Sequence, residues 1–394
     1  MRSETDVEHL NGQTKATGPL SGVVVADFSR VLAGPYATVI LADLGATVIK
    51  VEGPQGDDTR SWMPPAHEGV ASYYQAVNRN KHAITLDFND AEDLGVAQQI
   101  AAKADVFIHN FKPGSIEKFG LGYDSVRERN ASIIYTHISG FGTQEAGRDL
   151  PGYDILVQGM AGLMDMNGEP DGPPVRSGVS LFDLTAGMMT AVGIASALRH
   201  REVTGEGQLL ENNLLSNAIF TMANQYQVAT TTDTVPSRLG KEHGTIYPYN
   251  QFPTADGDLI VVAANNGQFK RLCDVLGLNE LVDDDRFNTP EQRNINRDEL
   301  RPILEGVLSQ RGKQQWYEQL SAAGLPVAPV QNVLEGYEMA KDLGLEPLWT
   351  TGQAGDLPTV RNSLSFSATP ASYRKTPPAM NEDADAIRAW LAQE

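Results

Sequence analysis

One acidic side chain, Asp183, stands where a carboxylate could do chemistry. It comes directly before the stretch 184–201, which is largely apolar as far as Leu198 and has the length and composition of a helix. An aspartate in this position commonly caps a helix, and the helix dipole also favours its ionised form. With an ordinary pKa of ~3.9 it would be charged at pH 7. Carboxylates of this kind can also form covalent intermediates. Capping and nucleophilic catalysis are compatible roles for Asp183, and the local sequence leaves both open.

Two further places suit a ligand. Asn110 and Phe111 follow the short apolar run 106–108 and precede the turn Pro113-Gly114. In open parallel sheets, ligands lie beyond the carboxyl ends of strands, and a flat ring can stack on an aromatic face. Near the N-terminus, the apolar run 23–26 leads to Gly34-Pro35 and a helix. Backbone N–H groups at such a helix start favour anions, so this turn is a second candidate ligand site.

Several common chemistries are excluded by their missing motifs. The sequence has no P-loop and no His-Glu-x-x-His, and its seven histidines are scattered, so we expect no metal site. Gly140 and Gly142 lack the third glycine of a dinucleotide fingerprint, and Ser180 lacks the final glycine of a nucleophile elbow.

The elements that must position these residues alternate between strands and helices. Short apolar runs predict buried strands, and the stretches between them predict helices. The predicted strands are 23–26, 48–51, 83–86, 106–108 and 132–138. We therefore expect an α/β fold with a large, doubly wound, Rossmann-like parallel sheet. After residue 230 a hairpin turning at Asp256-Gly257, short helices and a return strand at 327–330 predict a smaller α+β domain.

The composition of the chain disfavours some classes of binding partner. A formal net charge of −19 makes nucleic acid and anionic membrane surfaces poor partners. The single cysteine, Cys273, excludes an internal disulfide and fits a buried position. Residues 1–18 are polar, so we expect no signal peptide there, and the apolar stretch 186–198 is short enough for a buried core helix. We expect a cytoplasmic protein with no membrane association.

Four segments together resemble the class III coenzyme A-transferase family, also called the CaiB/BaiF family, which includes formyl-CoA transferases, carnitine CoA-transferases and acyl-CoA racemases. They occur in the order and at the spacing of that family and span nearly the whole chain after residue 18. The segments are 27–52 with Asp27-Phe28-Ser29-Arg30 and Ala33-Gly34-Pro35, 78–87 with Asn78-Arg79-Asn80-Lys81, 104–114 with Asn110-Phe111-Lys112-Pro113-Gly114, and 152–208 with Gly152-Tyr153-Asp154, Phe182-Asp183 and Gly205-Glu206-Gly207.

The resemblance implies a CoA-transferase that moves coenzyme A from an acyl-CoA thioester to a small free carboxylic acid. Asp183 would be the catalytic nucleophile, working through an aspartyl anhydride and a β-aspartyl-CoA thioester, with no metal or redox cofactor. The residues that the family implies for the coenzyme A site are Arg30, Val31, Ala33, Leu86, Asn110, Phe111, Lys118 and Tyr153.

Tyr153 separates two branches of that family. It lies 30 positions before Asp183, where the racemase branch has a histidine for proton transfer at the α-carbon. A tyrosine with an ordinary pKa of ~10 is a poor base at pH 7, so the transferase branch is favoured. A 2-methylacyl-CoA racemase and a non-catalytic acyl-CoA-binding protein are the alternatives.

The resemblance also implies an architecture. It implies a large coenzyme A-binding domain from 18–224 with 331–394, and a linker and small domain at 225–330, while the polar composition of residues 1–17 predicts a disordered tail. In this family each chain forms a ring threaded through its partner, so we expect an interlocked homodimer.

Overall fold

The computed structural model describes residues 16–67, 69–350 and 357–393, which fall into two compact units. The first unit comprises Met1–Leu163, Arg176–Thr234 and Glu346–Glu394, and the second comprises Met164–Val175 and Val235–Leu345. Of the tail expected at 1–17, residues 1–15 lie outside the described part of the chain.

The unit boundaries differ from the division at 225–330. Residues 164–175 join the second unit because the Arg238 guanidinium donates to the Asp165 carbonyl at 2.8 Å and pairs with its carboxylate at 3.0 Å. Residues 225–234 belong to the first unit, where the Tyr226 hydroxyl donates to the carbonyl oxygen of Ala161 at 3.0 Å. These side-chain contacts have no counterpart in the hydropathy pattern.

A six-stranded sheet forms the centre of the first unit, and all of its neighbouring strands are parallel. In spatial order the strands are β5 (Lys81–Thr85), β2 (Thr47–Glu52), β1 (Val24–Asp27), β6 (Val106–His109), β7 (Ile134–Ser139) and β8 (Gln208–Asn213). Numbered along the chain, this is the order 3-2-1-4-5-6 of Rossmann-type folds. The expected mixed α/β fold with a large parallel sheet is confirmed.

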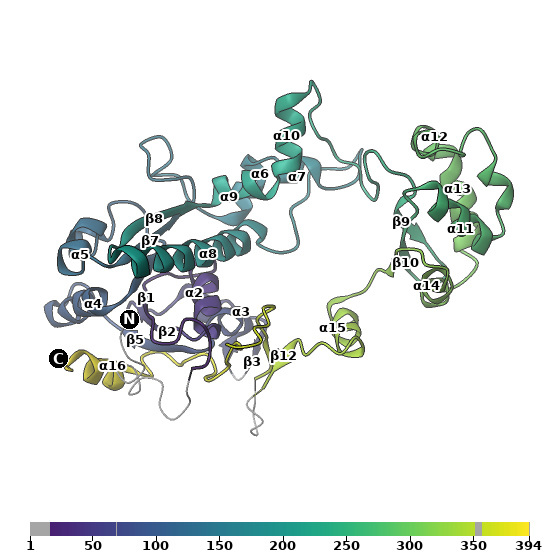
Figure 1. Cartoon of the computed structure of the whole chain (residues 1–394). Helices are drawn as coiled ribbons and strands as arrows, with labels where there is room; N and C mark the ends of the chain where they lie inside the picture. Colours follow the sequence, from purple (N-terminus) through teal and green to yellow (C-terminus); the bar gives the residue numbers. More distant parts are fainter. Residues whose placement is uncertain (1–15, 68, 351–356, 394) are drawn as a thin grey trace. The chain divides into compact units, whose positions relative to one another are not determined.

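Helices cover both faces of this sheet (Figure 1). α2 (Ala33–Asp43) packs on β1 and β2, and α8 (Leu181–Thr204) packs on α2, β7 and β8. The alternate side chains of the strands, among them Val24 and Ala26, share a core with α4 (Ala91–Lys103), α5 (Tyr123–Arg129) and α16 (Ala384–Leu391). Strands buried on both faces explain why the sequence shows continuous apolar runs.

By length and composition, α8 is the one helix in the described residues that could cross a membrane. In this fold Ala186, Ala191 and Ile194 of α8 are buried in the first unit, whereas Met188 and Val192 are exposed, so the expected core helix is buried on one face only. The other elements of this unit are short: η2 (Asp58–Ser61), β3 (Ala66–His67), β4 (Val70–Ala71), α3 (Ser72–Val77), η3 (Glu117–Phe119), α6 (Asp154–Met160), α9 (Leu214–Thr221), α10 (Ala223–Thr231), β12 (Leu348–Trp349) and β13 (Thr359–Val360), with α7 (Leu163–Met166) at the unit boundary.

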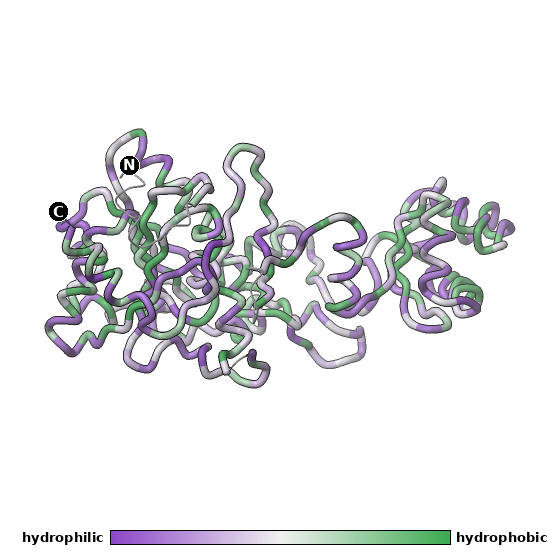
Figure 2. The backbone as a smooth tube through the Cα atoms, turned by 90° about the horizontal axis from the view of Figure 1, so that it is seen from below, coloured by the Kyte–Doolittle hydropathy of each residue, from purple (hydrophilic) through white to green (hydrophobic). Residues whose placement is uncertain are grey.

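The second unit has its own antiparallel sheet and core. β9 (Tyr249–Pro253) and β10 (Asp258–Val262) form the hairpin expected at Asp256-Gly257, and β11 (Val327–Pro329) pairs with β10. The helices α11 (Asn266–Leu276), α12 (Pro290–Ile295), α13 (Arg297–Leu308), α14 (Lys313–Ala322) and α15 (Val333–Asp342), with η4 (Asn279–Val282), complete it. These helices carry both hydrophilic and hydrophobic residues (Figure 2). Cys273 is buried in this core, as expected, and burial raises the pKa of its thiol to about 12.

Candidate active site

The strand order of the first unit reverses between β1 and β6, and their carboxyl ends lie side by side there. The chain leaves β1 at Asp27 and passes through 28–32 into α2, and it leaves β6 at His109 and continues into Asn110 and Phe111. Ligands of open α/β sheets bind in the crevice beyond such a reversal. Two of the segments singled out from the sequence therefore meet at this crevice.

A cavity of about 540 Å³ lies at these strand ends. Four of the predicted coenzyme A residues line it: Arg30, Leu86, Phe111 and Lys118. Leu86 is buried and Phe111 partly buried, whereas Arg30 and Lys118 are exposed. The Arg30 guanidinium carbon lies 6.0 Å from the centre of the Phe111 ring. Apolar side chains with two cations at the rim suit a ligand that has an aromatic ring and phosphates.

Asn110 contacts the neighbouring loop instead of lining the cavity. Its Oδ1 accepts the Arg30 backbone N–H at 3.0 Å, and its Nδ2 donates to the Arg30 carbonyl at 2.8 Å. This reciprocal pair ties the end of β6 to the loop after β1.

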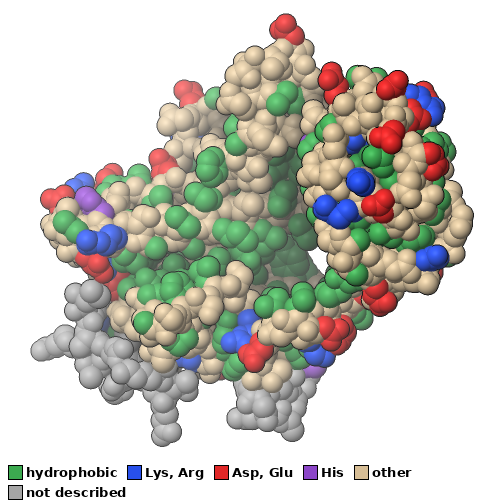
Figure 3. All heavy atoms as spheres, turned by 45° about the vertical axis from the view of Figure 1, so that its right-hand side comes forward, with side chains coloured by type: hydrophobic (Ala, Val, Ile, Leu, Met, Phe, Trp, Pro, Cys, Tyr) green, Lys and Arg blue, Asp and Glu red, His purple; other side chains and the backbone are tan. Residues whose placement is uncertain are grey.

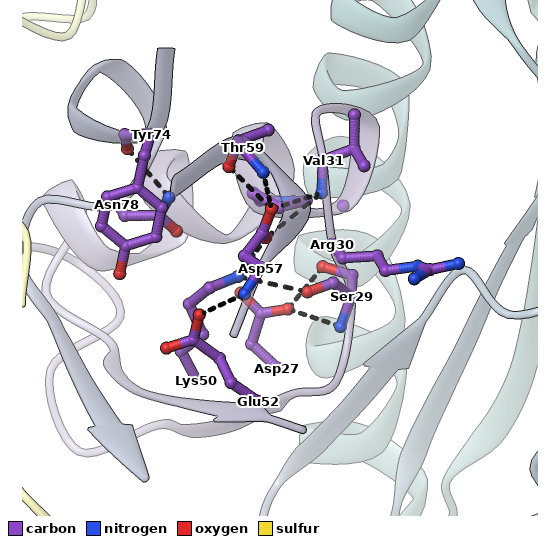
Figure 4. Close-up of polar contacts among 12 residues, drawn as sticks. Asp27, Ser29, Arg30, Val31, Lys50, Glu52, Asp57, Thr59, Tyr74 and Asn78 are labelled. Atoms are coloured by element: carbon purple, nitrogen blue, oxygen red, sulfur yellow. Dashed lines mark hydrogen bonds and ion pairs between the residues drawn. The ribbon is translucent and has the colours of Figure 1, made fainter. Parts of the chain in front are cut away.

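Val31 and Ala33 occupy the other side of that loop. The backbone of Val31 has a φ of 70°, and its N–H points at the carboxylate of Asp57, 3.2 and 3.3 Å from the two oxygens (Figure 4). Ala33 is buried as the first residue of α2, and its carbonyl faces Gly187 of α8, where an added Cβ would come within 2.8 Å of it. The loop is thus connected through α2 to the helix that carries Asp183.

Two buried histidines hold Phe111 and were missed by the sequence reasoning. His137 Nε2 lies 2.9 Å from the Phe111 carbonyl oxygen, and His109 Nδ1 accepts the Phe111 N–H at 3.4 Å. The two imidazoles stack with their centres 4.4 Å apart. Burial lowers the pKa of both, so neutral rings are favoured. The sequence clue to both histidines was their place near the carboxyl ends of two predicted strands, 106–108 and 132–138. In the structure these two strands are adjacent, and His109 pairs with His137 in register.

Asp183 lies in the first turn of α8, not at its N-cap. The helix begins at Leu181 and Ser180 is its N-cap, so the expected capping role of Asp183 is wrong. The free N–H groups of this turn are satisfied from outside the helix. Asp154 Oδ1 accepts the N–H of Phe182 at 2.8 Å and that of Asp183 at 3.2 Å. The capping carboxylate therefore comes from α6, a contact invisible in the local sequence.

The expectation that Asp183 would have an ordinary pKa is also wrong. Burial and the negative charge of Asp154 raise the pKa of Asp183 to about 7. Tyr73 of α3 lies close by, and it was missed in the sequence. Burial raises the pKa of Tyr73, a hydrogen bond with Ser180 opposes this change, and the charge of Asp183 adds to it. Asp183 thus has a carboxylate and a phenol as neighbours, and about half of its population would be ionised at pH 7.

Tyr153 is the N-cap residue of α6, directly before Asp154, and 65% of its side chain is exposed. The residue that touches the start of α8 is its neighbour Asp154. Within the described residues, no group of three or more His, Cys, Asp or Glu side chains is arranged to hold a metal ion.

Comparison with known proteins gives a consistent result. The sequence model described as CoA-transferase family III matches residues 20–384. A succinate–glutarate CoA-transferase of Agrobacterium fabrum is 38% identical over 382 residues, covering 95% of this chain and 96% of that protein. A succinyl-CoA:glutarate CoA-transferase of Mus musculus is 36% identical over 367 residues, covering 92% and 84%. The crystal structure of a CaiB/BaiF family protein from Brucella suis has a TM-score of 0.89 at 37% identity, covering 95% of this chain and 100% of that one.

Proposed function

The chain belongs to CoA-transferase family III, and from this premise we propose that Asp183 moves coenzyme A from an acyl-CoA thioester to a free carboxylate through covalent aspartyl intermediates. The observation that carries the proposal is the partly buried Asp183 carboxylate on the first turn of α8, a helix that packs on α2, which begins beside the cavity of about 540 Å³.

The transfer proceeds in four balanced steps. The Asp183 carboxylate attacks the thioester carbonyl, the C–S bond breaks, and an aspartyl-acyl anhydride forms with release of CoA thiolate. The thiolate attacks the aspartyl carbonyl and expels the donor acid as a carboxylate, which leaves a β-aspartyl-CoA thioester. The acceptor carboxylate attacks this thioester to form a second anhydride and free thiolate. Attack of the thiolate on the acceptor carbonyl gives the new acyl-CoA and restores Asp183.

The surroundings of Asp183 suit a nucleophile. A carboxylate with a pKa of about 7 is more basic than an ordinary aspartate and therefore more nucleophilic when ionised. Asp154 holds the backbone N–H groups of Phe182 and Asp183, which keeps the first turn of α8 in place. A fixed attacking oxygen contributes to catalysis by proximity.

In the coenzyme A site, four of the lining residues have a clear chemical task. Arg30 and Lys118 supply positive charge for phosphate groups at the open side of the cavity. Phe111 and Leu86 supply apolar contact for the adenine. Val31, Ala33 and Asn110 shape the loop that carries Arg30, and Tyr153 lies beside Asp154 at the start of α6.

For the substrates, we infer short dicarboxylic acids, with succinyl-CoA or glutaryl-CoA as donors. This inference is supported by the relatives named for succinate and glutarate, which match the chain over nearly its whole length. A screen of carboxylates as acceptors, read out by exchange of CoA, tests this choice. Monocarboxylates accepted more efficiently than succinate and glutarate would contradict it.

For the assembly, we propose that two copies of the chain form an interlocked homodimer. It is supported by exposed apolar side chains on α8, β8 and α9 of the first unit, among them Met188, Val192 and Phe220. Figure 3 shows hydrophobic side chains gathered on one face of this unit. A monomer in gel filtration over a range of concentrations would contradict it.

The mechanism is tested by trapping the intermediates on Asp183. Protein mixed with acyl-CoA and then with hydroxylamine should carry a hydroxamate on Asp183, located by peptide mass spectrometry. Asp183→Ala should lose both the modification and the transfer activity. The matched control is Asp149→Asn, an exposed carboxylate on a loop of the same unit, which should retain both. Full transfer by Asp183→Ala would refute the mechanism.

A further inference from the structure

The short loop Ser29–Val31 beside the cavity is held by side chains and not by a regular backbone ladder. Ser29 N–H donates to Asp27 Oδ1 at 3.0 Å, and Lys50 Nζ donates to the Ser29 carbonyl at 3.3 Å. Asn110 binds both the N–H and the carbonyl of Arg30. The next group along the chain, the N–H of Val31, is bound by Asp57. The loop therefore has a single arrangement imposed by its surroundings.

Val31 is the point in this loop that most needs such support. Its φ of 70° lies in the left-handed region, which β-branched residues rarely adopt because their side chain crowds the backbone. A residue in this state persists only where its surroundings overdetermine it. The Asp57 carboxylate supplies this constraint through the N–H of Val31.

Asp57 is itself rigidly placed. Its carboxylate accepts from Lys50 Nζ at 2.9 Å, from the Thr59 N–H at 3.0 Å and from the Thr59 hydroxyl at 2.7 Å. Its own N–H donates to Glu52 Oε1 at 2.8 Å, and the side chains of Asp57 and Lys50 have no exposed area. Figure 4 shows these bonds converging on Asp57 beneath the loop that carries Arg30. Every partner of its oxygens is a donor, so only a carboxylate satisfies them all.

The next residue, Asp58, extends this control to the side chain of Arg30. Its carboxylate lies 3.3 Å from the Arg30 guanidinium, and both side chains are about half exposed. Asp57 therefore fixes the backbone after Arg30, while Asp58 orients the guanidinium at the rim of the cavity.

We propose that Asp57 is a positioning residue of the coenzyme A site, which holds Val31 in the left-handed conformation so that Arg30 is presented to the phosphates of the ligand. The proposal rests on the proposed function for the identity of the ligand. It adds a role for a buried carboxylate that does not itself react.

A purely structural role for Asp57 makes a different prediction, and Asp43 is the matched control for it. Asp43 is also a buried carboxylate with no exposed side-chain area, paired with Arg79 at 2.5 Å, but it lies at the far end of α2 and does not line the cavity. Asp43→Asn should therefore lower the melting temperature without changing the KM for acyl-CoA.

The decisive variants are Asp57→Asn and the double variant Asp57→Asn with Val31→Gly. In Asp57→Asn, the side-chain amide N–H group faces hydrogen-bond donors in place of an acceptor oxygen. We expect the KM for acyl-CoA to rise roughly 10- to 100-fold, which is the loss typical of a charged hydrogen bond. The kcat should change much less. Val31→Gly should recover part of this loss, because glycine adopts a positive φ without strain. If Asp57 served stability alone, Asp57→Asn would lower the melting temperature and leave the KM for acyl-CoA unchanged.

A second measurement needs no ligand and so separates this proposal from the proposed function. Hydrogen exchange of the peptide covering 28–33 should be faster in Asp57→Asn than in the wild type and unchanged in Asp43→Asn. Should Asp57→Asn fail to fold, Thr59→Val removes only the 2.7 Å hydroxyl bond and should raise the KM severalfold. Unchanged KM and unchanged exchange in a folded variant would overturn the role of Asp57. Wild-type protein without CoA transfer would overturn the proposed function instead.

Discussion

Replacing Asp183 by asparagine should stabilise the protein at mildly alkaline pH while it abolishes CoA transfer. The wild-type carboxyl has a pKa of about 7 in place of 3.8, because it is buried and faces Asp154. The folded state therefore binds its proton more tightly than the unfolded state does. By linkage, the stability of the wild type falls as the pH rises from ~4 to ~7 and stays constant above this range. Asparagine cannot ionise and avoids this loss.

The size of the effect follows from the change in pKa. The difference between 3.8 and about 7 corresponds to roughly 4 kcal/mol, at about 1.4 kcal/mol for each factor of ten in proton affinity. Asp183 is only partly buried, so solvent screening reduces the expected gain to ~2–3 kcal/mol. Loss of the attraction between the charge and the helix N-terminus opposes it by ~0.3–1 kcal/mol. Burial outweighs the dipole, and a net stabilisation of ~1–3 kcal/mol remains.

Urea unfolding at pH 5 and at pH 8.5, at one protein concentration, measures this difference. At pH 5, between the two pKa values, only about a third of this loss of stability has occurred, so the two proteins should differ less there than at pH 8.5. At pH 8.5 Asp183→Asn should be more stable by the full amount. Asp149→Asn, the exposed control, should show the same difference from the wild type at both pH values. Equal differences for Asp183→Asn at pH 5 and pH 8.5 would refute burial of the charge as the cause.

The same residues give further predictions. The kcat/KM for transfer should fall about tenfold per pH unit below pH ~7, because the attacking form of Asp183 is the carboxylate, and a flat profile from pH 5 to 8 would contradict this. Asp154→Asn keeps an acceptor for the α8 N–H groups but removes a negative charge, so the acid limb of the kcat/KM profile should move to lower pH. An acid limb that stays in place would exclude the charge of Asp154 as a cause of the raised pKa of Asp183. Gly187→Ala places a Cβ 2.8 Å from the Ala33 carbonyl oxygen, so it should lower the free energy of unfolding by ~1–3 kcal/mol and reduce kcat. The control Gly95→Ala lies in α4 with open space around it, and thermal unfolding should show it to be neutral or stabilising.

Local patterns in the sequence were sufficient for five of the six strands of the large sheet and for the hairpin of the second unit. Short apolar runs mark β1, β2, β6 and β7 because strands buried on both faces need apolar side chains at every position. The pattern was weaker for β5, which begins two residues before the expected 83–86, since it includes the buried Lys81. Lys81 is tolerated there because it pairs with Asp27 at 3.1 Å, a contact between residues 54 positions apart.

The sequence by itself, through its resemblance to a family, determined which residues to examine: Asp183 and the lining residues Arg30, Leu86, Phe111 and Lys118. Only the tertiary structure decided what surrounds them. The capping of α8 by Asp154, the change in the pKa of Asp183, the histidines behind Phe111 and the bond from Val31 to Asp57 join residues that are distant in sequence. Hydropathy and propensity report on neighbours along the chain, whereas charge, burial and hydrogen bonding depend on neighbours in space.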